Sequence, residues 1–192
     1  MKKLLLSFAI VVGLGLVANA QKEGPVNKIS IGPDFLYPFG TVTDLGKLSD
    51  YYKLGYGGSI MGEYNITKKL NLTGSIGYMS LAYSKKVKDA NVGTTVNTDN
   101  NVYYPIKLGA KYYFGPVYAA ADAGVGLSLE DDRNSTFAFS GTVGKTFSVS
   151  PKSSIDLGIR YEGWSMYRDQ VGITFVDNYS FVGIRLAYAF GL

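Results

Sequence analysis

Histidine and cysteine, two residue types that carry much of protein chemistry, are absent from this 192-residue chain. Histidine is the commonest general base and metal ligand, and a nucleophilic serine usually needs such a base beside it. Without cysteine, no disulfide framework can form. The acidic run at 130–132 offers oxygen ligands for a divalent cation, but three acids in a loop are more often solvated. We therefore expect no enzyme activity, no cofactor and no metal.

Charged residues instead recur on one alternating face of several period-two segments. Five acids and four bases share this face: Asp34, Glu63, Lys107, Lys111, Asp122, Asp156, Arg160, Glu162 and Arg185. Ions held away from bulk water are tolerable only when they are paired and hydrogen-bonded. These residues predict a salt-bridged plug across a narrow lumen. The alternative is that several of them lie near the mouths and are solvated.

The segments that position these charges alternate apolar and polar residues, the pattern of β-strands. Eight such segments are predicted, at about 28–38, 54–66, 70–83, 102–114, 117–129, 136–149, 155–167 and 178–191. They are longer than the ~5–6 residues of an ordinary strand and match the ~9–11 residues that a tilted strand needs to cross a membrane. Strand length therefore favours a transmembrane barrel.

The connections between the predicted strands alternate in length. The even-numbered strands end in short turns, at 67–69, 115–116 and 150–154, and the odd-numbered strands end in longer polar segments. These longer segments are 39–53, 84–101, 130–135 and about 168–178. Short periplasmic turns alternating with longer extracellular loops are typical of outer-membrane barrels. Both termini are then expected on the periplasmic side.

The composition of the two faces separates a membrane barrel from a soluble one. In the fourth strand Ile106 and Leu108 alternate with Lys107 and Lys111, and across the strands the polar face is rich in glycine and small residues. A solvated surface would normally be rich in lysine and glutamate. Small residues with a few long charges suit the confined interior of an eight-stranded barrel. A soluble, lipocalin-like barrel remains the alternative.

Two outward positions bear on the membrane interpretation. Tyr104 and Phe114 share the apolar face ten residues apart, which is roughly 25 Å along the membrane normal for a tilted strand and matches the spacing of aromatic girdles. Lys145 fits poorly, because it falls on the apolar parity of the sixth strand. It either extends toward the periplasmic rim or marks a bulge that inverts the parity.

The first twenty residues have the features of a cleavable signal peptide. Lys2 and Lys3 precede a short apolar run, and Ala18 and Ala20 flank the expected cleavage site. Residues 21–27 would then form a short periplasmic tail and 28–192 the barrel. Losing the two leader lysines lowers the formal charge from +4 to +2, which does not suggest a nucleic-acid partner.

The final strand carries hydrophobic residues at every second position: Ile184, Leu186, Tyr188, Phe190 and Leu192. With the eight-strand pattern, it makes residues 28–192 resemble the eight-stranded OmpA/OmpX-like outer-membrane barrels. The resemblance extends to the outer membrane protein beta-barrel domain family of Bacteroidota. It implies that these five residues form the signal read by the barrel-assembly machinery. An aromatic residue usually comes last in that signal, whereas this chain ends in leucine.

We therefore expect an all-β, eight-stranded, antiparallel up-and-down transmembrane barrel, preceded by a cleavable signal peptide. The expected location is the outer membrane of a Gram-negative bacterium, in contact with its lipid and lipopolysaccharide. The expected role is non-catalytic, either structural or in surface interaction through the loops, whose ligand the sequence does not identify. A narrow porin-like channel for small or apolar solutes and a soluble ligand carrier are the alternatives.

Overall fold

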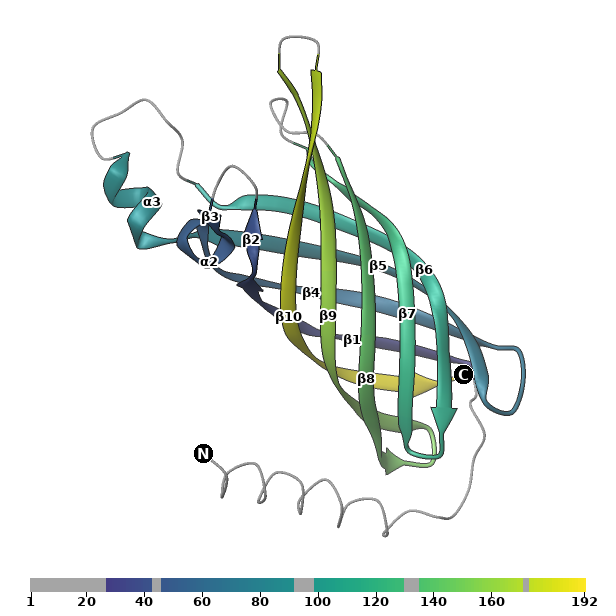
Figure 1. Cartoon of the computed structure of the whole chain (residues 1–192). Helices are drawn as coiled ribbons and strands as arrows, with labels where there is room; N and C mark the ends of the chain where they lie inside the picture. The colour runs from purple at the N-terminus through teal and green to yellow at the C-terminus, as the bar shows by residue number, and fades with distance from the viewer. Residues whose placement is uncertain (1–26, 43–45, 92–98, 130–134, 171–172) are drawn as a thin grey trace.

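The computed structural model describes residues 27–42, 46–91, 99–129, 135–170 and 173–192 (Figure 1). Eight of its strands form one closed antiparallel barrel, which confirms the predicted fold class. These strands are β1 (Lys28–Phe39), β4 (Tyr52–Asn65), β5 (Leu70–Tyr83), β6 (Asn101–Phe114), β7 (Val117–Leu127), β8 (Thr136–Ser150), β9 (Ser153–Gln170) and β10 (Ile173–Gly191).

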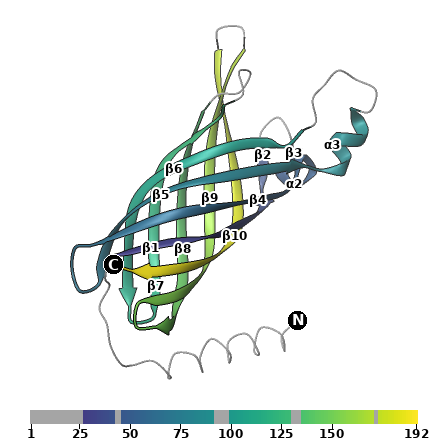
Figure 2. The same cartoon turned by 180° about the vertical axis from the view of Figure 1, so that it is seen from behind.

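The barrel closes because β1 pairs with both the second and the last of these strands. Asp34 lies opposite Gly57 on β4 and opposite Arg185 on β10. The Leu192 amide donates to the Asn27 carbonyl at 2.9 Å, so both ends of the described barrel meet. The short turns lie at this same end, called here the turn end, and the opposite end is the loop end (Figures 1 and 2).

The period-two pattern places alternate side chains inside and outside the wall, as the pleat of a strand requires. On β9, Ile159 and Tyr161 are exposed on the outer face, whereas Arg160 and Glu162 are buried in the lumen. The outer face carries isoleucine, leucine, valine and aromatic side chains around the whole barrel. This arrangement is the reverse of a soluble protein, in which apolar side chains point inward.

Glycine allows neighbouring strands to approach closely at two points of the wall. A Cβ atom at Gly57 would lie 1.9 Å from the Tyr78 carbonyl oxygen, and one at Gly124 would lie 2.0 Å from that of Ile106. No side chain fits at these distances, so glycine is required there. The glycine-rich segment at 54–59 therefore belongs to the wall, within the strand predicted at 54–66.

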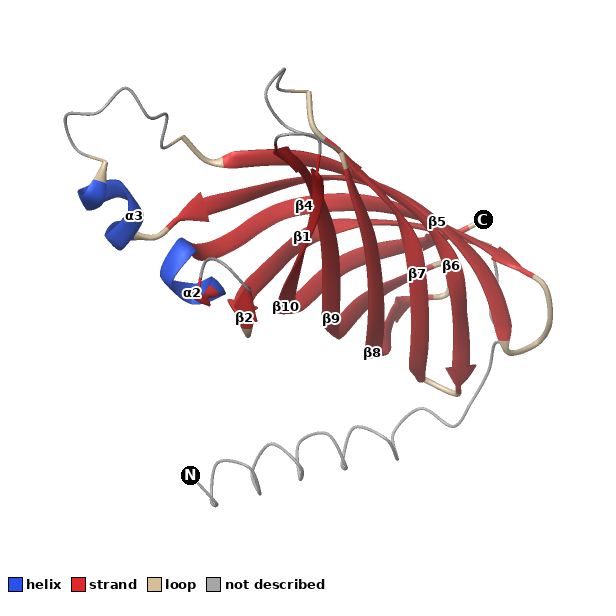
Figure 3. Cartoon of the chain, turned by 45° about the horizontal axis from the view of Figure 1, so that its top comes forward, coloured by secondary structure: helices blue, strands red, loops and turns tan. Residues whose placement is uncertain are grey.

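The first two loops are more ordered than the sequence suggests (Figure 3). The predicted polar loop at 39–53 contains β2 (Thr41–Val42), β3 (Gly46–Lys47) and the one-turn helix α2 (Leu48–Tyr51), and β4 already begins at Tyr52. The next loop contains α3 (Lys85–Ala90). Val42 and Leu48 are buried, which explains why the first loop folds onto the barrel mouth. Among the described residues, no helix is long and apolar enough to cross a membrane.

The prediction of a long polar loop at about 168–178 is wrong. β9 runs to Gln170 and β10 begins at Ile173, and the two strands pair continuously from one end to the other. Their neighbours stop earlier, with Thr136 of β8 opposite Met166 and Phe39 of β1 opposite Ser180. The hairpin therefore extends beyond the rest of the barrel (Figure 1). The run Ile173–Val176 is rich in the β-branched and aromatic residues that favour strands.

Candidate functional site

All nine charged residues of the predicted inward face are buried in the lumen, each with at most 6% of its surface exposed. They come from β1, β4, β6, β7, β9 and β10. The two remaining barrel strands, β5 and β8, contribute neutral polar groups instead, among them Thr73 and Ser140. Around the barrel, β8 lies between the charged strands β9 and β7, and β5 lies between the charged strands β6 and β4.

Five of the charges form a connected set, the arginine group: Asp34, Lys107, Arg160, Glu162 and Arg185. The Asp34 carboxylate pairs with both guanidinium groups, at 3.2 Å from Arg160 and 3.1 Å from Arg185. Glu162 pairs with Lys107 at 2.9 Å and with Arg160 at 3.4 Å. Arg160 therefore joins the two acids into one network that crosses the lumen.

Three further charges form the lysine group: Glu63, Lys111 and Asp156. The Lys111 ammonium lies 2.8 Å from Glu63 and 2.5 Å from Asp156, so one base pairs with two acids. Its Nζ also lies 3.9 Å from the centre of the Tyr118 ring, a distance at which the ring quadrupole attracts a cation. The Tyr113 hydroxyl donates to Glu63 at 2.6 Å. Each acid thus has a partner besides the lysine.

Of the five acids in the predicted set, Asp122 is the one that the structure does not bring to a base. Thr73 donates to its carboxylate at 2.9 Å and Ser140 at 3.3 Å, and no basic group among the described residues lies within ion-pairing distance. Hydrogen bonds satisfy this carboxylate. The structure therefore brings eight of the nine residues into ion pairs, and hydroxyl groups hold the ninth.

Neutral side chains complete the network, and the sequence reasoning did not identify them. They donate to the buried acids from neighbouring strands, as Asn71 does to Glu63 at 2.9 Å and Thr146 does to Asp156 at 3.0 Å. Ser59 donates to Asp34 at 2.5 Å. All three occupy alternate positions that point into the lumen, as the charges do. This alternation is the sequence pattern that identifies them.

Above the charges, toward the loop end, the lumen becomes apolar. The apolar cap consists of buried residues from the strands and the first loop: Leu36, Val42, Leu48, Tyr52, Met79, Leu81, Tyr103, Ala138, Trp164, Tyr179 and Phe181. Trp164 joins the two regions. Its indole nitrogen donates to Glu162 at 2.8 Å, while its ring packs edge-on against Tyr103 with centroids 5.1 Å apart.

This arrangement of ions, hydrogen-bonding groups and apolar side chains fills the lumen. Every charged side chain in it is held by a counter-charge or by hydroxyl groups. Among the described residues, no group of three or more acidic side chains is placed to hold a metal ion. The acidic run at 130–132 lies outside the described residues. The buried ions link strands on different sides of the lumen.

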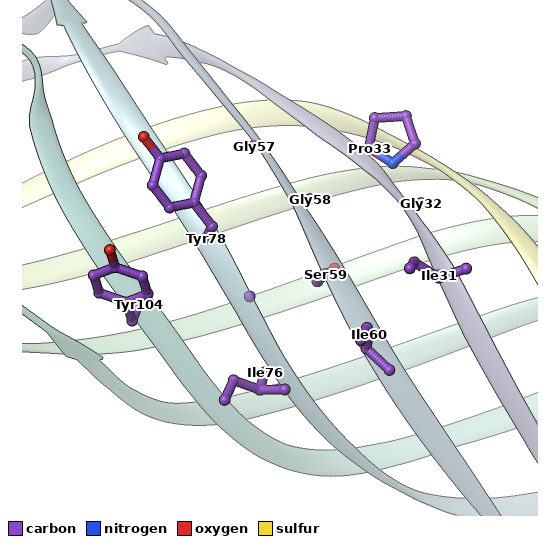
Figure 4. Close-up of a pocket in the computed structure, with 11 residues that line it drawn as sticks. Ile31, Gly32, Pro33, Gly57, Gly58, Ser59, Ile60, Ile76, Tyr78 and Tyr104 are labelled. Carbon is purple, nitrogen blue, oxygen red and sulfur yellow. The ribbon is translucent and has the colours of Figure 1, made fainter.

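A groove on the wall faces outward and not into the lumen (Figure 4). Its floor includes Gly32, Gly57, Gly58 and Gly77, and outward isoleucines together with Tyr78 and Tyr104 form its sides. The rings of these two tyrosines meet edge-on, with centroids 5.8 Å apart. The groove is a shallow depression in the outer wall, at a place where the lining glycines have no side chains.

The other predicted site residues lie away from the lumen or outside the described chain. Ile184, Leu186, Tyr188, Phe190 and Leu192 are exposed on the outer face, and the rings of Tyr188 and Phe190 lie 4.8 Å apart. Ala18 and Ala20 lie outside the described residues, so the structure says nothing of the cleavage site.

Comparison with known proteins gives likeness in structure alone. No protein-family model matches the chain, and no curated protein sequence matches it. Neisserial surface protein A matches with a TM-score of 0.56 and 14% identity, covering 89% of this chain and 100% of that one. The outer membrane protein AlkL in lipid bilayers matches with a TM-score of 0.52 and 10% identity, covering 91% and 94%.

The outer membrane protein OprG from Pseudomonas aeruginosa has a TM-score of 0.50 and 9% identity, with coverage of 88% of this chain and 97% of that one. The likenesses run over nearly the whole barrel in each case. The chain therefore has the fold of outer-membrane β-barrel proteins.

Proposed function

We propose that this chain is a non-catalytic integral outer-membrane protein, with a structural or surface-interaction role and a lumen closed by paired charges. The observation that carries the proposal is the inverted distribution of side chains. Apolar residues cover the outside of the wall, and buried ions fill the inside. A lipid bilayer is the environment that makes such an outer face stable.

The outer face argues against the soluble carrier. Leu108 and Phe114 on β6 have 72% and 63% of their surface exposed, and similar side chains surround the barrel. Monomeric soluble proteins rarely expose contiguous apolar patches larger than a few hundred Å². The ten-residue separation of Tyr104 and Phe114 corresponds to roughly 25 Å along the normal, the height of the apolar band of such barrels.

The filled lumen argues against a channel. An eight-stranded barrel has an interior just wide enough for side chains. Here Arg160, Lys111 and Glu162 occupy that space, each within ion-pairing distance of a partner from another strand. Ions in transit would have to break these pairs, and separating a buried pair is costly. The apolar cap lies above them and adds a second barrier.

The orientation follows from the leader and the connections. A chain exported through a signal peptide cleaved after Ala20 would place residue 28 and the short turns in the periplasm. The longer loops, with α2 and α3, would then face the outside and meet lipopolysaccharide or an extracellular ligand. Membership of the outer membrane protein beta-barrel domain family of Bacteroidota remains a prediction.

The last strand would carry the assembly signal. Phe190 and its alternate neighbours point outward, where a barrel-assembly machine can reach them before the strand is surrounded by lipid. We expect Phe190→Ser to reduce the folded fraction recovered from cell envelopes, while Ala187→Ser, on the inward face of the same strand, has a smaller effect. Equal recovery of both variants would contradict this role.

Heat-modifiable migration tests the membrane barrel directly. The protein is extracted from envelopes in detergent and run on SDS gels with and without boiling. Folded outer-membrane barrels resist SDS and migrate differently until heated, so two bands are expected. A single band in both lanes, together with recovery of the protein in the aqueous fraction without detergent, would favour the soluble carrier and overturn the proposal.

A further inference from the structure

Lys145 breaks the apolar pattern of the outer wall. Among the side chains that the structure describes, it is the only charged one on the outer face of the barrel strands apart from Lys53 at the loop end of β4. Its outward neighbours on β8, Val143 and Phe147, are exposed. The register shift of this strand lies between Ser148 and Ser150, beyond the lysine, so no bulge turns it inward.

The position of Lys145 is the turn-end rim of the barrel. It lies opposite Val117, the first residue of β7, and the next amide, that of Thr146, donates to Pro116 in the β6–β7 turn at 2.7 Å. Beyond this point β8 pairs only with β9. The lysine therefore stands where the wall formed by β6 and β7 ends.

The side chain leans toward that rim. Its Nζ lies 4.9 Å from the ring centre of Phe147, the next outward residue toward the turn end. Extending the ammonium out of the apolar layer in this way removes most of the cost of a lipid-facing lysine, ~2–4 kcal/mol at the midplane but only ~0–1 near an interface. No acidic group among the described residues forms an ion pair with it.

The surroundings at this end are basic. Lys68, Lys69 and Lys152 are exposed in the turns, and no aspartate or glutamate among the described residues is exposed there. The acids of the described chain with exposed side chains, Asp50, Asp89 and Asp99, lie at the loop end instead.

We propose that Lys145 binds the phosphate of an anionic phospholipid in the leaflet at the turn end, with its acyl chains against Val143, Phe147 and Leu157. Lys152, in the turn that follows β8, adds attraction for the same head group, because each lysine near an anionic surface contributes favourably. This inference rests on the proposed function, since it requires the barrel to span a bilayer. A phospholipid supplies both parts of the site, the phosphate for the ammonium and the chains for the apolar wall.

The test is lipid selectivity in reconstituted vesicles. The mature protein is inserted into phosphatidylcholine vesicles that contain trace spin-labelled phosphatidylglycerol or phosphatidylcholine, and the motionally restricted fraction of each label is measured. We expect the wild type to prefer phosphatidylglycerol by about two- to fivefold, from the attraction of a lysine near the surface. Lys145→Gln should lose most of this preference, and Lys145→Arg should keep it.

Lys85→Gln, in α3 at the loop end, is the matched control and should keep the full preference. Equal association of the two labels with the wild type would overturn the proposal, as would a wild-type preference in Lys145→Gln. A loss seen only in Lys152→Gln would overturn the assignment to Lys145. Insertion is checked on the same vesicles by heat-modifiable migration. Failure to insert would contradict the membrane barrel itself, whereas insertion without selectivity would contradict the lipid site alone.

Discussion

Lys111 and Leu48 are both almost completely buried in the same barrel, with 2% and 0% of their surface exposed, but different forces hold them. Lys111 lies among acids from two other strands and forms an ion pair with each of them. Leu48 comes from the first loop and packs with strand side chains of the apolar cap. The lower lumen is built entirely by strands, whereas the mouth is built partly by a loop.

This difference separates two tasks that one lumen performs. The ionic region joins strands that are far apart in the sequence, as in the Arg160–Asp34 pair, and its disruption should loosen the whole barrel. The first loop supplies part of the apolar cap. Disrupting the cap should therefore expose the mouth of the barrel to solvent but lower the stability of the strands less. Trp164 touches both regions and is the only tryptophan in the chain, which makes its fluorescence a reporter for each.

The largest effect is expected from Glu162→Gln. This change leaves Lys107 without its counter-charge and weakens the hold on Arg160, and removing one partner of a buried pair costs about 3–5 kcal/mol. Equilibrium urea unfolding in detergent, followed by Trp164 fluorescence, should show a midpoint well below that of the wild type. Tyr161→Phe, on the outer face of the same strand, is the control. A Glu162→Gln midpoint equal to that of the control would mean that the ionic region does not stabilise the barrel.

Leu48→Ala tests the cap. Truncating a buried leucine costs about 2–5 kcal/mol, and the lower end applies here because the loop can settle into the space. Iodide should quench Trp164 more strongly in this variant, while the urea midpoint falls less than in Glu162→Gln. Leu129→Ala removes an exposed leucine and should leave both quantities unchanged. If quenching stays at the wild-type level, the first loop does not close the mouth.

A double-mutant cycle measures one ion pair within the network. Asp34→Asn and Arg185→Gln should each destabilise the barrel, and the double variant should lose less than their sum. Contacting charges in one network typically show a coupling of about 0.5–3 kcal/mol. The same urea unfolding provides all four free energies. If the two effects on the free energy of unfolding are strictly additive, the 3.1 Å ion pair between Asp34 and Arg185 does not contribute to stability.

The smallest effect is expected from the surface pair between the two loops. Lys86 and Asp50 lie 3.1 Å apart with 74% and 49% of their side chains exposed, and pairs of this kind contribute about 0.2–1 kcal/mol. Asp50→Asn should lower the urea midpoint slightly at low salt and not at all at high salt. A large loss that persists in salt would show that the loops are coupled to the wall more tightly than the cap contacts suggest.

The sequence predicts the barrel and the inward position of its charges because one period-two pattern continues through every strand. It does not predict which charges meet, since register alone decides that Asp34 lies opposite Arg185, 151 residues away. The sequence does not predict the apolar cap. Val42 and Leu48 stand singly among the turn-forming residues of 39–53, so they form no periodic apolar pattern. The β9–β10 extension was missed because Asp169 and Gly172 resemble a loop, although the flanking residues pair as strands.

Single-channel recording in planar bilayers tests the closed lumen most directly. The folded protein should insert without any stable unit conductance, because paired charges and an apolar cap fill the path. The double variant Glu162→Gln with Leu48→Ala removes one member of the ionic region and one of the apolar cap. It should produce larger conductance steps than either single variant. A stable unit conductance in the wild type that is abolished by replacing Arg160 or Glu162 would contradict the closed lumen.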